Sequence, residues 1–453
     1  MADVEEKHPD YTTESINEWA LMRATKKGES EIKRKAELYL PKPSGFTMAS
    51  DGGTAMYNAY RKRAQFEEIV SPTISSLIGL AHNKETEIEL PESMNYIIEK
   101  ANKKGLTLNA FHQSITRNLL TTGRYCILTD APVDGGEPIL CGFIGETLIN
   151  WDEGSEFYVI DDSGPVRNGF KWTDQKRHIV LELVEGKYVQ KIYIDGVEAV
   201  EQIEPTALGN KAMDRIPFAV ANALDMTPDI QTPPLIGVAQ AALANYQLSA
   251  DYRHQLFMSG QETLVAINGK GPTAVGAGVI HEMQGAEGID PDLKYVSPTC
   301  SGIEAHKEAM QANRSTAATA GARLLEQQDG NKQESGEARG LRFTSETASL
   351  QSIVNVSAQI LERSLRDVAL MKGLNEDDVS VTPPKDLMDQ TLNPQDAKAL
   401  VEVWQAGGVS HQTLDENLQR GGIRSKERTF EEEIVLINSV DDADEDDDLQ
   451  AAA

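Results

Sequence analysis

The sequence predicts an α+β protein built from several modules. Three long helical patterns follow one another between Pro233 and Gly373, and strand patterns fill much of residues 124–194. The chain has 453 residues, more than one hydrophobic core usually supports, so about two to four modules are expected. Its composition, 40% hydrophobic and 25% charged, is typical of a soluble globular protein.

The N-terminal part begins with helical patterns over residues 39–99. One apolar face is formed by Phe66, Ile69, Val70, Ile74, Leu77 and Ile78. Strands are expected over Arg124–Thr129, Ile139–Ile144, Glu156–Ile160, His178–Val184 and Tyr188–Ile194. Gly186 stands where a hairpin turn is needed, so the last two strands form an antiparallel pair, and Gly135-Gly136 is expected to join another pair.

The first long helix opens at Pro233-Pro234 and ends before Gly260, because proline suits a first helical turn and glycine a helix end. A second helix is expected over Ile303–Gln328. It is rich in alanine, so neighbouring segments can approach it closely. A third helix is expected over Thr344–Met371, with one apolar face and a capping hydroxyl at Thr344.

A small insert separates the first two helices. Its strands are expected at Thr263–Ile267 and Lys294–Val296, with too little apolar material for a core of their own. Between the second and third helices, Asp329–Gly340 holds no large apolar residue and is expected to be a solvated loop. Taken alone, such a stretch favours an ordinary surface loop in a helical hairpin.

Short motifs accompany this order of helix, insert, helix, loop and helix. The N-terminal half contains His8-Pro9-Asp10-Tyr11 followed by Trp19, Tyr39-Leu40-Pro41, Leu90-Pro91, Gly123-Arg124-Tyr125 and Thr147-Leu148-Ile149-Asn150-Trp151. The C-terminal half contains Ala406-Gly407-Gly408-Val409-Ser410 between two short helical patterns, and then Gly421-Gly422-Ile423. In this order and with these motifs, nearly the whole chain resembles the portal proteins of tailed bacteriophages, the head-to-tail connectors through which DNA is packaged.

The resemblance implies a division of the chain into named parts. They are a wing over 1–232, a stem over 233–260 and 301–328, a clip over 261–300, a tunnel loop over 329–340, a long wing helix and return strand over 341–385, crown helices over 386–430 and an acidic tail over 431–453. The return strand is expected near Val379–Val381.

The resemblance also implies a function and a set of partners. The chain would form a ring, by family likeness a dodecamer, at one capsid vertex of a virion assembled in the host cytoplasm. The ring would conduct double-stranded DNA with weak contact and dock the terminase motor, the major capsid and scaffolding proteins, and the head-completion or tail adaptor proteins. No cofactor, metal or catalytic residue is implied.

Site residues follow from position in that order. Lys332, Gln333, Glu334 and Ser335 are expected in the loop nearest the DNA. Lys270, Thr273, Glu282 and Lys294 are expected on the clip surface that faces the motor. Ala317 and Ala320, on the alanine-rich helix, are expected at the contact between subunits.

Motifs for catalysis are incomplete. Gly186-Lys187 and Gly269-Lys270 are not followed by Ser or Thr, as a phosphate-binding loop requires, and His281-Glu282 lacks a second histidine at zinc-protease spacing. Gly276-Ala277-Gly278 begins a dinucleotide-binding pattern, but His281 stands where the third glycine is required. Gly408–Gln412 lacks the final glycine of a nucleophile elbow. An enzyme is therefore not expected, and the energy to move DNA would come from another protein.

Charge limits the nucleic-acid hypothesis. With 71 acidic and 43 basic residues, the net charge is −28, so tight DNA binding through a basic face is not expected. Weak contact would let a duplex slide, although the acidity is equally explained by solubility alone.

Cys126, Cys141 and Cys300 are widely spaced and are expected to be free thiols. The acidic, polar N-terminus and the lack of a long apolar run predict neither a signal peptide nor a membrane anchor.

Two other classes remain open. A virion-associated hydrolase would need a set of acid, base or metal ligands that the motifs do not supply. A different virion structural protein, such as a head-closure or baseplate component without a DNA channel, would keep the strands but would not explain the order of the helices.

Overall fold

The computed structural model describes the following parts of the chain. They are residues 3–131, 136–208, 211–260, 263–271, 288–296, 302–322, 336–384, 387, 394–420, 423–424, 428–432 and 434–435, with the backbone alone for 200–202, 263, 322, 336–348, 394–397 and 420.

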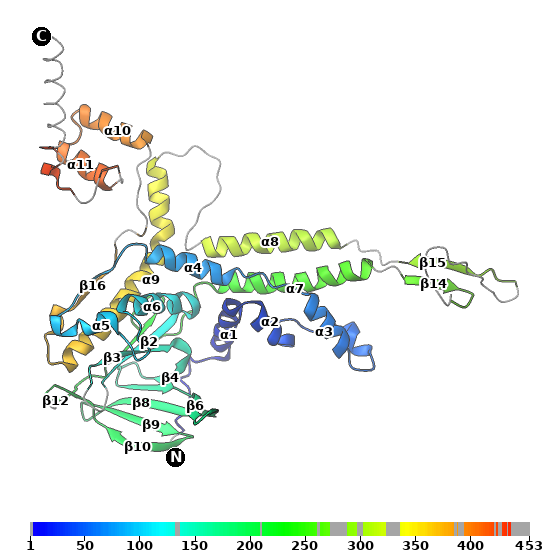
Figure 1. Ribbon diagram of the computed structural model, residues 1–453, viewed down its shortest axis with the longest axis horizontal. Helices are drawn as coiled ribbons and strands as arrows, with labels where there is room; N and C mark the ends of the chain where they lie inside the picture. The colour runs from blue at the N-terminus through cyan, green and yellow to red at the C-terminus, as the bar shows by residue number, and fades with distance from the viewer. Residues whose placement is uncertain are drawn as a thin grey trace, which may run out of the picture.

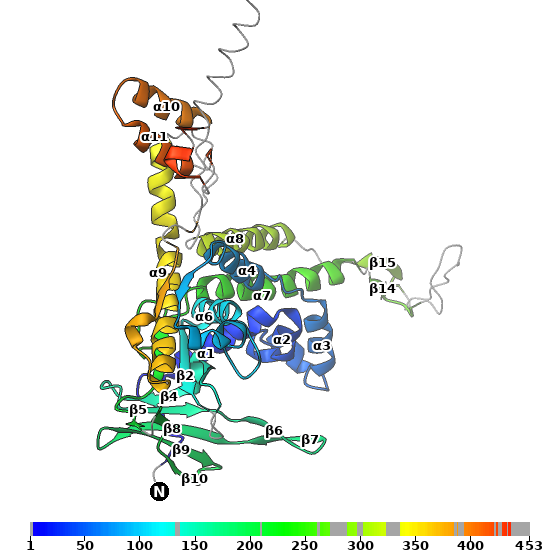
Figure 2. The same cartoon turned by 60° about the vertical axis from the view of Figure 1, so that its left-hand side comes forward.

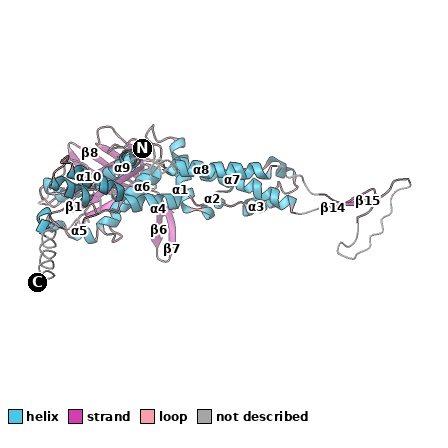
Figure 3. Cartoon of the chain, turned by 90° about the horizontal axis from the view of Figure 1, so that it is seen from above, coloured by secondary structure: helices cyan, strands magenta, loops and turns pink. Residues whose placement is uncertain are grey.

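The molecule is elongated and flat. A pair of long helices extends from one side and carries a small hairpin at its far end, while the sheets and the longest helix gather at the other side (Figure 1). Seen from above, the hairpin over residues 164–175 projects out of this flat outline (Figure 3).

Six helices precede the first sheet. They are α1 (Thr13–Lys27), α2 (Glu29–Arg34), α3 (Thr54–Arg63), α4 (Val70–Ala81), α5 (Tyr96–Glu99) and α6 (Leu108–Thr122). Thr12 and Thr107 cap α1 and α6, since each hydroxyl accepts a hydrogen bond from a backbone N–H of the first turn. The expected apolar face is present in α4, where Val70, Ile74, Leu77 and Ile78 are buried. Phe66 is also buried, but it precedes the helix, so its place on that helical face was wrong.

A three-stranded antiparallel sheet forms the middle layer of the sheet region. Its strands β2 (Arg124–Asp130), β3 (Ile139–Ile144) and β13 (Phe218–Asn222) pair in the order β13-β2-β3. Along β2, Tyr125 and Ile127 pack with the helices, whereas Cys126 and Leu128 pack with the second sheet. Because successive side chains in a strand alternate between faces, a strand buried on both sides contributes to two cores.

The second sheet has five antiparallel strands in the order β10-β9-β8-β5-β4. They are β4 (Leu148–Trp151), β5 (Phe157–Asp161), β8 (Arg177–Val184), β9 (Lys187–Ile194) and β10 (Val197–Ile203). The turn between β8 and β9 has positive φ at both Glu185 (51°) and Gly186 (74°), as a type I′ turn requires. The predicted hairpin is therefore confirmed.

Four shorter pairs complete the described strands. They are β1 (Glu87–Glu89) with β16 (Ser380–Thr382), β6 (Gly164–Asn168) with β7 (Lys171–Gln175), β11 (Thr206–Ala207) with β12 (Lys211–Ala212), and β14 (Thr263–Ile267) with β15 (Asp292–Val296). β16 is the return strand expected near Val379–Val381, and β14 has the bounds predicted from the sequence. β15 begins two residues before its predicted start.

The long helices are α7 (Ile236–Ser259), α8 (Ile303–Ala322) and α9 (Gly336–Met371). All three were expected, but α9 begins earlier than predicted. Residues Gly336–Gly340, assigned from the sequence to the loop, belong to this helix. Glu337, Ala338 and Arg339 favour helix strongly enough to offset the cost of the two glycines at the ends of this stretch.

Two short helices lie near the C-terminus, α10 (Pro394–Gln405) and α11 (His411–Arg420). The linker between them was predicted. Gly407 has φ 76°, and the Ser410 hydroxyl accepts a hydrogen bond from Thr413 N at 3.1 Å, so Ser410 caps α11. The Trp404 and His411 rings stack at 5.2 Å across the linker.

Among the described residues, Cys126 and Cys141 are free thiols, and burial raises the pKa of Cys126 to about 12 and that of Cys141 to about 11. Cys300 lies outside the described residues. Within the same described ranges, no helix is long and apolar enough to cross a membrane, and no group of three or more His, Cys, Asp or Glu side chains could hold a metal ion.

Candidate functional site

Helices α7 and α8 form an antiparallel pair that approaches closely. A Cβ added at Gly237, at the start of α7, would lie 3.3 Å from the Ala320 Cβ, near the end of α8. One at Gly321 would lie 3.2 Å from Thr73 Cγ2 of α4. The small residues of α8 therefore serve contact with α7 and α4 of the same chain.

This packing changes the expectation for the two interface alanines. Ala317 is 1% exposed and belongs to the main core, so its side chain is not free to contact a second subunit. Ala320 is half-buried and packs against the same core. The prediction that placed Ala317 at a subunit contact is corrected, because the helix turns that residue toward its own chain. Exposed small side chains of α8 include Ala305, Ala312, Ser315 and Ala318.

One carboxylate links the two helices to the chain that precedes α4. Glu67 Oε2 accepts hydrogen bonds from Arg314 Nε of α8 at 2.7 Å and from Asn245 Nδ2 of α7 at 2.9 Å. The Ser249 hydroxyl, also on α7, donates to the Gln65 carbonyl at 2.7 Å. Polar contacts thus fix the α7–α8 pair to the N-terminal helices.

A polar hollow of about 670 Å³ lies beside these contacts, between α7 and α8. Lys307, Glu308 and Arg314 of α8 and Tyr252 and Arg253 of α7 line it. Two carboxylates, Glu67 and Glu308, line it together with the cationic side chains, so charges of both signs face this hollow.

The outer half of α7 is supported by α3. Tyr60 donates a hydrogen bond to Asp251 Oδ1 at 2.5 Å, and burial together with this carboxylate raises the pKa of Tyr60. The Arg63 guanidinium lies 4.1 Å from the Phe257 ring centroid. Burial and Arg63 lower the pKa of His254. These contacts stiffen the helix that carries β14 and β15.

The β14–β15 hairpin lies at the end of the helix pair (Figures 1 and 3). Lys270 is exposed just after β14, and Lys294 is exposed on β15 opposite Val265. Thr273 and Glu282 lie outside the described residues, as do the loop residues Lys332, Gln333, Glu334 and Ser335. The structure therefore brings Lys270 and Lys294 to one small hairpin.

Helix α9 is the axis around which the sheets and α6 pack. His112 Nε2 of α6 lies 3.0 Å from Ser357 Oγ of α9, in a wholly buried contact. Nearer the end of α9, Arg215 donates hydrogen bonds to Asp367 Oδ1 at 2.7 and 3.0 Å and to Glu376 Oε2 at 2.6 Å. Burial raises the pKa of Asp367 to about 6 despite the two nearby arginines, Arg363 and Arg215.

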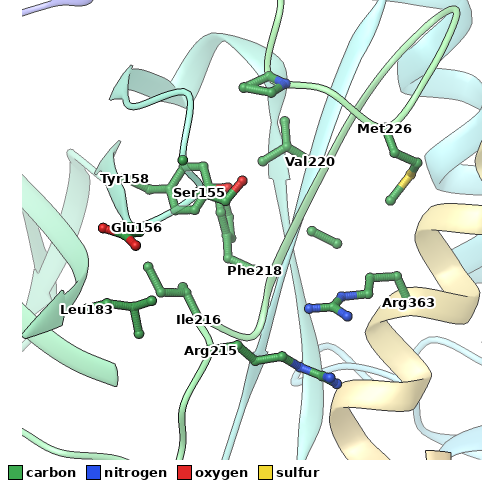
Figure 4. A pocket seen from close by; sticks show the side chains of 13 residues that line it. Ser155, Glu156, Tyr158, Leu183, Arg215, Ile216, Phe218, Val220, Met226 and Arg363 are labelled. Carbon is green, nitrogen blue, oxygen red and sulfur yellow. The ribbon is translucent and has the colours of Figure 1, made fainter. Parts of the chain in front are cut away.

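A second hollow, of about 370 Å³, lies between the five-stranded sheet, β13 and α9 (Figure 4). Glu156 and Tyr158 line it from the sheet, Phe218 and Val220 from β13, and Arg363 from α9. The sequence analysis missed this hollow and the exposed β6–β7 hairpin. For the hairpin a signal existed, because Gly169-Phe170 between two strand-like runs fits a two-residue turn with glycine at its first position.

Comparison with known proteins adds three findings. The family described as "Domain of unknown function (DUF4055)" matches residues 234–370, which span α7, the β14–β15 hairpin, α8 and nearly all of α9. No curated protein matches the chain.

Solved structures that are similar to this chain come from gene transfer agent particles. A chain of "Neck of native GTA particle computed with C12 symmetry" is 14% identical, with a TM-score of 0.40 over 77% of this chain and 89% of that one. A chain of "Neck of empty GTA particle computed with C6 symmetry" is also 14% identical, with a TM-score of 0.40 over 78% and 90%. A chain of "Virion of native gene transfer agent (GTA) particle" is 14% identical, with a TM-score of 0.41 over 80% and 92%.

Proposed function

We propose that this chain is a portal subunit, which forms a ring at one capsid vertex and conducts double-stranded DNA during packaging and ejection. The observation that carries the proposal is the antiparallel α7–α8 pair with a small hairpin at its far end, followed along the chain by the 36-residue helix α9. This arrangement separates a narrow outer end from a broad base along one elongated molecule (Figure 1). Such subunits, set side by side around an axis, enclose a channel whose two ends present different surfaces.

The parts of the chain then take the following roles in our proposal. Residues 1–232 with β16 form the wing, α7 and α8 the stem, residues 261–300 the clip, 329–335 the tunnel loop, α9 the long wing helix and 386–430 the crown. We assign Lys332, Gln333, Glu334 and Ser335 to the channel loop. Lys270, Thr273, Glu282 and Lys294 are assigned to the clip surface that faces the terminase motor.

Charge gives the channel its proposed behaviour. A chain with a net charge of −28 holds few cations that could bind phosphates tightly, so DNA would slide with weak contact. Energy for packaging would come from the terminase motor. The same ring would contact major capsid and scaffolding proteins at its broad base and head-completion or tail proteins at its clip.

The direct test is the assembly itself. Purified protein should form rings with a central hole in negative-stain images, and its mass should be an integral multiple of the 49.6 kDa chain, with twelve copies as the expected number. A head-closure or baseplate component without a channel would give particles without the hole. A protein that stays monomeric at micromolar concentration and cleaves DNA or nucleotides would contradict the proposal and favour a hydrolase.

Loop function has its own test. Replacing residues 331–335 with a short glycine turn should leave rings intact, because loop length changes closure entropy only slightly. Packaging or retention of DNA should fail, since the proposed closest contact with the duplex is removed. Normal DNA-filled particles would show that this loop does not contact the DNA.

A further inference from the structure

The β6–β7 hairpin is an outward continuation of the β5–β8 pair. In β5–β8, Phe157 pairs with Glu182 and Asp161 with His178, and beyond them Gly164 pairs with Gln175 and Asn168 with Lys171 in the same register. Among the described strands, β6 and β7 form a sheet of their own, with no third strand beside them. Figures 2 and 3 show this ribbon leaving the body of the molecule. We call residues 163–176 the arm.

The tip of the arm exposes large apolar side chains. Phe170 is 98% exposed, Trp172 66% and Val166 45%. A two-stranded ribbon has no core in which such residues could be buried, so they add nothing to its own stability. A cluster of exposed aromatic residues on a projecting element indicates a protein-binding surface.

Charge at the tip differs from that of the chain. From Ser163 to Thr173 the charged residues are Arg167 and Lys171, both cationic, whereas the whole chain carries −28. Arg167 pairs across the ribbon with Trp172. The arm therefore combines aromatic anchors with positive charge, and its partner should combine an apolar hollow with negative charge.

The opposite end of the same strand pair has that combination. The hollow of about 370 Å³ lies at the start of β5 and the end of β8, whereas the arm leaves from the end of β5 and the start of β8. Its walls include the apolar side chains of Tyr158, Leu183, Ile216, Phe218, Val220 and Met226 (Figure 4). The β4–β5 turn, which contributes Gly154, Ser155 and Glu156 to the lining, has three carboxylates in residues 152–156 and no cation.

The two arginines of the hollow do not reverse this charge. Arg215 is paired with both Asp367 and Glu376, and Arg363 Nε lies 3.7 Å from Asp367 Oδ2. Arg215 and Arg363 carry two positive charges, and Glu156, Asp367 and Glu376 carry three negative charges. This group of side chains therefore has a net charge of −1. The Arg363 guanidinium points into the hollow, where an inserted aromatic ring would give it a cation–π contact (Figure 4).

We infer that the arm of one copy of this chain docks into the 370 Å³ hollow of a second copy, with Phe170 and Trp172 as anchors and Arg167 and Lys171 facing the acidic β4–β5 turn. The inference rests on the ring proposed above. An arm and a receiving hollow at opposite ends of one strand pair make a head-to-tail contact, and such contacts form a ring when the rotation between neighbouring copies closes on itself. The arm also leaves the flat molecule across its thin direction (Figure 3), in which copies set side by side around the proposed axis would follow one another.

Cross-linking between two differently tagged, co-expressed variants tests the contact. One carries Asn168→Cys at the arm tip, which keeps both anchors and both cations, and the other carries Ser155→Cys at the rim of the hollow. Mild oxidation should give a covalent pair that contains both tags. Two kinds of control account for cross-links through the native thiols. In the first, each cysteine variant is co-expressed with the unmodified chain. In the second, Asn168→Cys is co-expressed with Thr47→Cys. A mixed-tag yield no higher than in these controls would overturn the inference.

Assembly gives an independent test that separates this inference from the proposed function. Phe170→Ala with Trp172→Ala should raise the protein concentration needed for assembly at least about tenfold, whereas Asn168→Ala with Thr173→Ala, on the same ribbon, should leave it unchanged. Lys171→Glu should weaken assembly, and Glu156→Lys in the same chain should restore it. Rings that form normally from the double-alanine variant would overturn the docking but leave the portal function standing. Absence of rings from the unmodified chain would overturn the function, and the cross-link would still decide the contact.

Discussion

The carboxylate of Asp367, wholly buried on α9, accepts two hydrogen bonds from the Arg215 guanidinium, at 2.7 and 3.0 Å. Arg215 precedes β13 and also binds Glu376, so this one cation joins the sheet region, α9 and the turn that follows α9. Because burial raises the pKa of Asp367 to about 6, the folded chain binds a proton there more readily than the unfolded chain does.

The first prediction follows from that pKa. Between about pH 4 and pH 6 the folded state holds more protons at Asp367 than the unfolded state, so this group's contribution to stability falls as pH rises. The free energy of unfolding of the unmodified chain, minus that of Asp367→Asn, should fall by about 1–3 kcal/mol over this range. Urea titrations at pH 4, 5, 6 and 7 measure it, with exposed Asp377→Asn as control. A difference that does not change with pH would show that the carboxyl is not buried in this way.

A second prediction concerns the buried histidine pair, with opposite sign. The His82 and His112 rings lie 4.8 Å apart, and burial lowers the pKa of His82 to about 4 and that of His112 to about 3. Below about pH 6.5, His82 and His112 bind protons in the unfolded chain but stay neutral in the folded chain. The free energy of unfolding therefore decreases as pH falls from about 6.5 toward 4. His112→Gln should reduce this acid loss by about 1–3 kcal/mol in the same titrations. Gln is chosen because its amide can keep the hydrogen bond to Ser357 without titrating. If stability fell as steeply with pH in the variant, that result would count against a neutral, buried His112.

A third prediction separates folding from assembly on α8. Ala317→Leu should destabilise the chain by about 1–3 kcal/mol, because the larger side chain overpacks a full core. Ala318→Leu, one position along on the exposed face, should change stability by less than about 0.5 kcal/mol. Chemical denaturation of the two variants gives the comparison. Equal, small effects would mean that Ala317 is not in the core.

The N-terminal segment supplies a fourth prediction. Trp151 lies between the His8 ring, stacked at 4.0 Å, and the Arg124 guanidinium, 4.3 Å from its ring centroid. Trp151→Leu should remove both contacts, destabilise the chain by about 2–4 kcal/mol and speed amide hydrogen exchange over residues 4–12. The same change at exposed Trp172 should leave the stability of the single chain within about 0.5 kcal/mol. Unchanged exchange at the N-terminus of the first variant would show that Trp151 does not hold this segment.

Helices and buried strands were readable from the sequence because their periodicity reflects burial within the chain. The apolar face of α4 and the strands β2, β3, β8 and β9 show this clearly. Strand β13 was missed, since its small residues Ala219 and Ala221 lie between two layers and give little alternation. The hairpin turns at Asp195-Gly196 and Gly169-Phe170 carried a glycine signal that was not used in predicting the strands.

Site residues were harder to predict than secondary structure, because composition does not show which face of a helix packs against its own chain. An alanine-rich helix indicates close approach but not the identity of the neighbour. In α8 the neighbours of Ala317 and Ala320 are α7, α4 and the rest of the main core. The hollow beside Arg363 could not be predicted at all, since it is assembled from residues between 154 and 363 that meet only in the fold.

Helix α9 gives the molecule a mechanical property. Its 36 residues span about 54 Å, and buried side chains from Leu350 onward hold its second part in the core. A rigid rod transmits a tilt along its whole length. A tilt of about 5° about the Met371 end would move the Gly336 end by about 5 Å, roughly the rise of one helical turn. Small displacements among the sheets would therefore reach residues 336–340 enlarged.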